Sequence, residues 1–172
     1  TRIDKIEYLN KEISSYLIKI NNQDLNDSQS IEVFTLVSVV NNINSIKNSV
    51  KLRFHDLLIK KDIRSSVLSD EVLSEVESYH KKMVKQIKRL GKFFEKYDKV
   101  KIDKIIAKGE KYKDLEEKYR IESIQRSDRS DQSNEEKTSP IYMELMDMLK
   151  EISIFIDIIA TRLSDLDEIN DN

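Results

Sequence analysis

Side chains suited to catalysis are scarce in this sequence. Histidine occurs twice, as His55 and His80, and the chain has no cysteine. A His-Glu-x-x-His zinc pattern is missing, and so are a Gly-x-Ser-x-Gly elbow and a glycine-rich phosphate loop. Each histidine lies beside an apolar stripe, so we expect it to border the core and not to bind a ligand. We therefore predict no enzymatic activity and no cofactor.

Basic residues are concentrated between positions 81 and 101, where nine of them oppose two acidic residues. Such a patch attracts anionic lipid headgroups, at about 1 kcal/mol per basic residue near the surface. The residues that would make this contact are Lys81, Lys82, Lys85, Lys88, Arg89, Lys92 and Lys96.

The interpretation that we favour for this stretch is a solvated outer face, or a face opposite an acidic helix. Positions 139–172 would supply that helix, with eight acidic and two basic residues. Aromatic residues do not interleave the basic stretch, so nucleic acid is not expected as a partner.

The composition indicates a helical protein in one domain, residues 1–172. The chain has 30 basic and 32 acidic residues, which argues against a nucleic-acid binder. Two glycines and one proline are fewer than sheets or phosphate loops need. No apolar run approaches 18 residues, and the first residues given lack the charged-then-apolar pattern of a signal peptide, so we expect neither a membrane span nor a signal peptide in this stretch. Because the first residue is Thr1 and not Met, we expect a piece of something longer.

Apolar residues spaced three and four apart predict five amphipathic helices. The five stripes comprise Ile3, Ile6, Leu9, Ile13, Tyr16 and Ile20; Val33, Phe34, Val37, Val40, Ile43, Val50, Phe54 and Leu57; Val76, Met83, Ile87, Leu90, Phe94 and Tyr97; Ile102, Ile105, Tyr112, Leu115 and Tyr119; and Tyr142, Leu145, Leu149, Ile152, Ile156, Ile159, Leu163 and Leu166. These faces must pack together, so we predict an all-α antiparallel bundle of five to six helices. A long coiled coil is the main alternative architecture.

Capping residues and breakers predict where the helices begin and end. Asp27, Ser69 and the Ser139-Pro140 pair are good starts. A single helix from residue 70 to 126 would be about 85 Å long, so we place a break near residues 97–101, where Asp98 could cap a new helix. Residues 127–138 contain no apolar side chain and predict a mobile polar loop.

Three segments together resemble a known family. Residues 3–6 read Ile-Asp-Lys-Ile and continue at 11–17 as Lys-Glu-Ile-Ser-Ser-Tyr-Leu, residues 39–46 read Val-Val-Asn-Asn-Ile-Asn-Ser-Ile, and residues 142–152 read Tyr-Met-Glu-Leu-Met-Asp-Met-Leu-Lys-Glu-Ile. Their order and spacing resemble the PhoU-like domain, most closely the one that follows the membrane part of bacterial sodium/phosphate cotransporters. The resemblance implies two pseudo-repeats, at about 1–96 and 97–172.

The family's metal-binding motif is altered in the first half. The family has a Glu-Arg-Ile-Gly-Asp segment whose two carboxylates face an acidic pair on the preceding helix and hold metal ions. The corresponding carboxylate positions here resemble Asn44 and Asn48. Ser45 takes the place of the arginine and Lys47 that of the glycine, so the motif has lost two negative charges and gained a positive one.

The rest of the motif is also incomplete. In the second half the carboxylate pair corresponds to Lys150 and Ile154. The residual candidates are Glu110 and Asp114, four residues apart on one helix face, and Asp4 on the first helix. Hard cations prefer several carboxylate oxygens, so we predict that the family's metal cluster is degenerate here.

The resemblance implies a non-enzymatic regulatory domain of a sodium-dependent phosphate transporter, acting by protein contact at the cytoplasmic face of the cell membrane. Its partner would be the membrane domain of the same chain or a separate transporter, with homodimerisation and an anionic lipid surface as further candidates. The alternatives are a free-standing PhoU-like adaptor that regulates phosphate uptake, and an unrelated helical scaffold.

Overall fold

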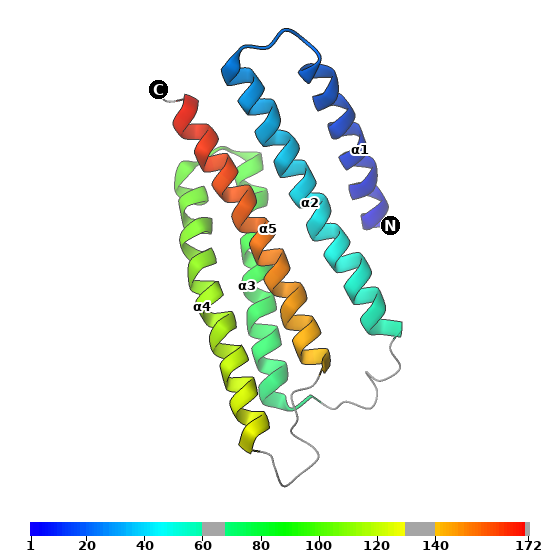
Figure 1. Cartoon of the computed structure of the whole chain (residues 1–172), viewed down its shortest axis with the longest axis vertical. Coiled ribbons are helices and arrows are strands. Elements are labelled where there is room, and N and C mark those ends of the chain that lie inside the picture. Colours follow the sequence, from blue (N-terminus) through cyan, green and yellow to red (C-terminus); the bar gives the residue numbers. More distant parts are fainter. Residues whose placement is uncertain (60–67, 130–139, 171–172) are drawn as a thin grey trace.

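The fold is a bundle of five helices and, over the described residues, contains no strand. We analysed a computed structural model that describes residues 1–59, 68–129 and 140–170. The helices are α1 (Arg2–Asn21), α2 (Asp27–Ile59), α3 (Asp70–Glu95), α4 (Lys99–Arg129) and α5 (Pro140–Asn170). Successive helices run in opposite directions (Figure 1). The predicted all-α bundle is thus confirmed.

The helix starts agree with the capping signals. Ser69 precedes α3, and its hydroxyl accepts a hydrogen bond from the amide of Val72. The break between α3 and α4 falls at residues 96–98, where Asp98 directly precedes the new helix. The loop predicted at 127–138 begins later than expected, because residues 127–129 still belong to α4. The remainder of that segment, residues 130–138, lies outside the described residues.

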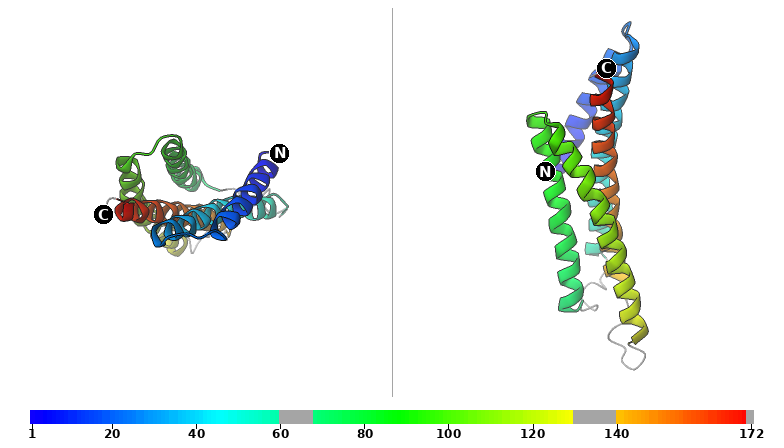
Figure 2. Two further views of the ribbon diagram at one scale, coloured as in Figure 1. Left: turned by 90° about the horizontal axis from the view of Figure 1, so that it is seen from above. Right: turned by 90° about the vertical axis from the view of Figure 1, so that its left-hand side faces the viewer.

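Helix α5 is the centre of the bundle. It packs against α2, α3 and α4, whereas α1 packs on α2. Two apolar clusters follow α5 from end to end. One joins α5 to α2, α3 and α4 around Ile105 and Ile156, and the other joins it to α3 and α4 around Tyr79, Met83 and Met146. Helix α1 contributes to neither cluster, so it lies at the edge of the fold (Figure 2).

Three of the predicted stripes are only partly buried. The stripes of α4 and α5 are largely buried, as expected, whereas much of the α1 stripe and parts of the α2 and α3 stripes are exposed. The exposed members are Ile6, Leu9, Ile13 and Tyr16 of α1, Phe34, Ile43 and Val50 of α2, and Ile87 and Phe94 of α3, with Tyr97 beyond its end. Periodicity identifies the apolar side of a helix but not the neighbour that covers it. On α1 the single fully buried apolar side chain is Leu17, which lies outside the predicted stripe.

Candidate functional site

Nine exposed apolar side chains form what we call the concave apolar face. They are Ile6, Leu9, Ile13 and Tyr16 of α1, Ile43 and Val50 of α2, and Leu73, Ile87 and Phe94 of α3. Their exposed fractions run from 36% to 64%. Exposed apolar patches of more than a few hundred Å² mark interaction sites in soluble proteins. This face is therefore the first candidate for a binding surface.

Helix geometry brings the α1 and α2 members of this face to one side. On α1, Glu7 faces α2, and the apolar stripe lies roughly 100–180° around the axis from it. On α2, Lys47 faces α1 and Ser49 faces α5, while Ile43 and Val50 project between these two directions. Because both helices are right-handed and run antiparallel, the two sets share one side. Helix α3 rises on that same side of the α2–α5 layer (Figure 2).

The orientation of α1 is fixed by charges. The carboxylate of Glu7 accepts hydrogen bonds from Lys47 at 3.1 Å and from Lys51 at 2.9 Å. The Lys47 side chain is only 8% exposed, and the carboxylate of Glu7 compensates this largely buried charge. The bond from Lys51, followed by that from Lys47, lowers the pKa of Glu7. These contacts hold the polar side of α1 against α2 and leave its apolar stripe uncovered.

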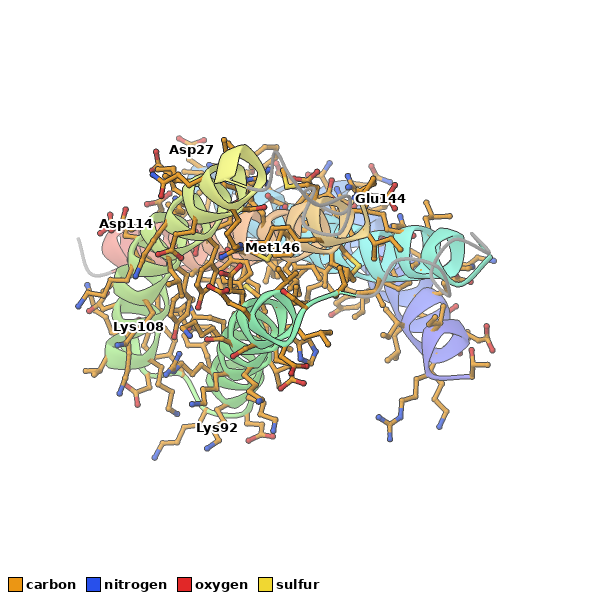
Figure 3. The ribbon with its side chains drawn as sticks, turned by 90° about the horizontal axis from the view of Figure 1, so that it is seen from below. Asp27, Lys92, Lys108, Asp114, Glu144 and Met146 are labelled. Carbon is orange, nitrogen blue, oxygen red and sulfur yellow. The ribbon has the colours of Figure 1, made fainter. Side chains whose placement is uncertain are left out.

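A second surface, the basic face, lies on the outer side of the α3–α4 hairpin. It consists of Lys81, Lys85, Lys88 and Lys92 of α3, Lys96 directly after its end, and Lys104, Lys108 and Lys111 of α4. Spacings of three and four residues align each set along one side of its helix. Figure 3 labels Lys92 on α3, which is exposed, and Lys108 on α4, which is half-buried.

The structure divides the basic residues that the sequence singled out. Lys82 is half-buried and donates to the hydroxyl of Ser78, and Arg89 donates to the side chain of Gln86, so both are committed within the fold. The other five form the α3 part of the basic face. The α4 part was not predicted, because the basic stretch of the sequence ends at position 101 and only the contact between α3 and α4 adds these lysines to it.

The ion pairs described for the acidic residues of α5 do not involve the basic stretch. The acidic side chains of α5 pair with other helices instead. Glu151 contacts Arg53 of α2, Asp147 contacts Arg120 of α4, and Asp157 lies near Lys113 of α4. The α3 lysines therefore lie on a solvated outer face, which is the first of the two possibilities in the interpretation that we favoured.

Two buried carboxylates are held in ion-pair networks between helices. Glu75, 8% exposed, accepts two hydrogen bonds from Arg126, at 2.7 and 2.9 Å, and one from the hydroxyl of Tyr142 at 2.8 Å. Glu116, 3% exposed, pairs with Arg120 and with Lys150, the latter at 3.0 Å. These contacts join α3 to α4 and α5 at Glu75, and α4 to α5 at Glu116.

Asp157 is a half-buried carboxylate with weaker compensation. Neither of its oxygens accepts a hydrogen bond from the described residues, and Lys113 Nζ lies 3.5 Å from Oδ2. Burial raises the pKa of Asp157, and the nearby Lys113 opposes that rise. The carboxylate lies against Gly109, where a Cβ atom would be 2.1 Å from Oδ1. The absence of a side chain at Gly109 therefore permits the close contact between α4 and α5.

The residual metal candidates are not brought together. Glu110 and Asp114 are exposed on α4, and Figure 3 shows Asp114 at the outer edge of the bundle. Asp4 closes a capping box with Thr1 at the start of α1. Among the described residues, no group of three or more potential ligands of the His, Cys, Asp or Glu type converges.

The positions at which the family would carry its motif have other roles here. Asn44 and Asn48 are half-buried on α2, Ile154 is 42% exposed, and Lys150 is bound to Glu116. His80 is exposed on α3. The side chain of His55 lies outside the described residues.

No helix in the described ranges is long and apolar enough to cross a bilayer. Comparison of the chain with models of known families, with curated proteins and with solved structures gave no match.

Proposed function

We propose that this chain is a non-enzymatic interaction domain that regulates a sodium-dependent phosphate transporter by protein contact, through its concave apolar face. The observation that carries the proposal is the exposed stripe of Ile6, Leu9, Ile13 and Tyr16. These residues repeat at intervals of three and four, which is the pattern that a helix presents to a partner helix. No helix in the described part of the chain covers them.

The geometry of the face suits one kind of partner. Side chains of α1, α2 and α3 contribute to it from a bent layer of helices, with α1 and α3 rising on the same side (Figure 2). An amphipathic helix placed along α1 would bury its apolar side against this surface. Binding energy of this kind comes from burial of apolar area, at about 25 cal/mol per Å² removed from water.

The identity of the partner rests on the resemblance to PhoU-like domains. That resemblance indicates the membrane part of a phosphate transporter, in the same chain or as a separate protein. Docking would act by favouring one state of the transporter, to the extent that the domain binds the two states with different affinity.

The test is phosphate uptake in cells that produce the full-length protein with two changes on α1, Leu9→Glu and Ile13→Glu. Tyr8→Glu with Ser15→Glu is the matched control, because these exposed residues lie on the other flank of α1 and the charge change is the same. We expect sodium-driven uptake of labelled phosphate to change several-fold in the first variant and to stay within two-fold of wild type in the control. Unchanged uptake in both variants would refute the proposal.

Sedimentation velocity of the purified chain addresses self-association through the same face. If the wild-type chain and the Leu9→Glu, Ile13→Glu variant are both monomers, the face is available to the transporter. A dimer that dissociates on these substitutions would show that a second copy of the chain occupies the face, and would overturn transporter contact through it.

A further inference from the structure

We propose that the basic face of the α3–α4 hairpin lies flat on an anionic phospholipid bilayer. The inference uses different residues from the proposed function and does not depend on it. It begins with two lysine stripes on adjacent antiparallel helices, Lys81 to Lys92 on α3, followed by Lys96 just after its end, and Lys104 to Lys111 on α4. Hydrogen bonds such as that from Gln86 to the carbonyl of Ile105 hold the two helices side by side.

The lysines of this face are available for an external partner. Of the eight, Lys81 pairs with Glu77 at 3.0 Å. Within the part of the chain that the structure describes, the other seven form no ion pair. Seven like charges on one side of two helices repel one another, and the face therefore gains most from a surface that carries many negative charges.

The residue types favour a bilayer over a nucleic acid. The face is built from lysine, a strongly hydrated point charge, and its one neighbouring arginine, Arg89, is bound to Gln86. Bidentate contacts with bases need arginine or amide side chains, and single strands need exposed aromatic rings for stacking. The phenylalanines and tyrosines of α3 and α4 lie off the two lysine stripes.

The chemistry also predicts how the contact would behave. The exposed apolar side chains of α3, such as Ile87 and Phe94, lie on the opposite flank from the lysines. Adsorption through the basic face is therefore electrostatic, with little insertion, and weakens as salt shortens the Debye length. Each lysine near an anionic surface strengthens binding about five-fold.

The experiment is co-sedimentation of the chain with vesicles of phosphatidylcholine that contain 30 mole per cent phosphatidylglycerol (a composition chosen on the order of natural anionic content). We expect binding at low salt, loss of binding at about 0.5 M NaCl, and no binding to pure phosphatidylcholine. The variant Lys88→Gln, Lys92→Gln, Lys108→Gln should bind about 100-fold more weakly. Circular dichroism of each variant would verify that the helices are retained.

The matched control removes the same charge from another surface. Lys5→Gln, Lys11→Gln and Lys19→Gln lie exposed on α1 and should weaken vesicle binding less than three-fold. Equal losses in the two triple variants would overturn the proposal, because attraction would then follow net charge alone. So would an absence of binding to anionic vesicles, or tighter binding to duplex DNA than to the vesicles. The concave-face variant Leu9→Glu, Ile13→Glu should keep its vesicle binding, which separates this proposal from the proposed function.

Discussion

The two glycines of this chain lie in helices, and the same substitution should have opposite effects on them. Gly91 is exposed on α3, and a Cβ atom there would have no neighbour within 4 Å. Gly91→Ala should therefore raise the free energy of unfolding by the difference in helix propensity between the two residues, about 0.5–1 kcal/mol. For a chain of this size, 1 kcal/mol corresponds to a rise in Tm of about 2–4 °C.

At Gly109 the same methyl group meets the carboxylate of Asp157. The distances from the Cβ position to Oδ1, Cγ and Oδ2 would be 2.1, 2.7 and 2.8 Å, so the side chain or the helices must move. Overpacking of this kind costs about 1–3 kcal/mol. After subtraction of the propensity gain, we expect Gly109→Ala to lower the free energy of unfolding by about 1 kcal/mol.

Urea denaturation of the two single variants measures this difference directly, and a third variant identifies its cause. In a chain that already carries Asp157→Ala, the carboxylate that the new methyl group would meet is absent. Gly109→Ala should then raise the free energy of unfolding, as Gly91→Ala does. The coupling energy of the two sites should be about 1–2 kcal/mol. If Gly109→Ala stabilises the wild-type chain as much as Gly91→Ala does, the close contact between α4 and α5 is refuted.

Three further predictions concern the buried and interhelical charges. Glu75→Gln should lower the free energy of unfolding by about 1–3 kcal/mol, because it removes the buried carboxylate partner of Arg126 and leaves only the exposed Glu71; a loss below about 0.5 kcal/mol in urea would contradict the network. Burial raises the pKa of Asp157, so the folded state keeps this proton to higher pH than the unfolded state, and Asp157→Asn should gain stability over wild type as pH rises from about 4 to 7. A difference that does not depend on pH would disprove this account. The pKa of Glu7 is lowered by the two lysines of α2 that it contacts, so its contribution holds above pH 4–5 (roughly the pKa of free glutamate) and is lost on acidification. Hydrogen exchange of the α1 amides should accordingly accelerate in acid and in the Glu7→Gln variant. If these amides were protected equally in the variant and in wild type at neutral pH, Glu7 would not hold α1 against α2.

Much of the fold could be predicted from local sequence signals. The helix count, the start of α5 at Pro140 and the break before Lys99 follow from caps, breakers and the spacing of apolar residues. These signals act over a few residues and do not depend on the rest of the chain. The last residues of α4 were missed, since residues 127–129 contain no apolar side chain and nevertheless continue the helix.

The two candidate faces depend on tertiary arrangement, and the sequence alone could not provide them. The apolar stripe of α1 predicts burial, but Glu7 turns the other side of the helix toward α2. Likewise, the lysines of α3 and α5's acidic residues have opposite charges, yet the topology pairs the acids with α2 and α4. Charge and periodicity describe each helix separately, and only packing decides which surfaces meet.

The two faces meet on α3, where consecutive residues belong to different surfaces. Ile87 lies in the concave apolar face and Lys88 in the basic face, and neighbouring positions on a helix differ by about 100° around its axis. A domain resting on a bilayer through its lysines would therefore direct the apolar face sideways, along the membrane plane. A membrane protein beside the domain could reach that face without displacing it from the lipid. Loss of vesicle binding in the lysine variant should then weaken regulation only by lowering local concentration, whereas Leu9→Glu with Ile13→Glu should abolish it while the domain stays bound to lipid.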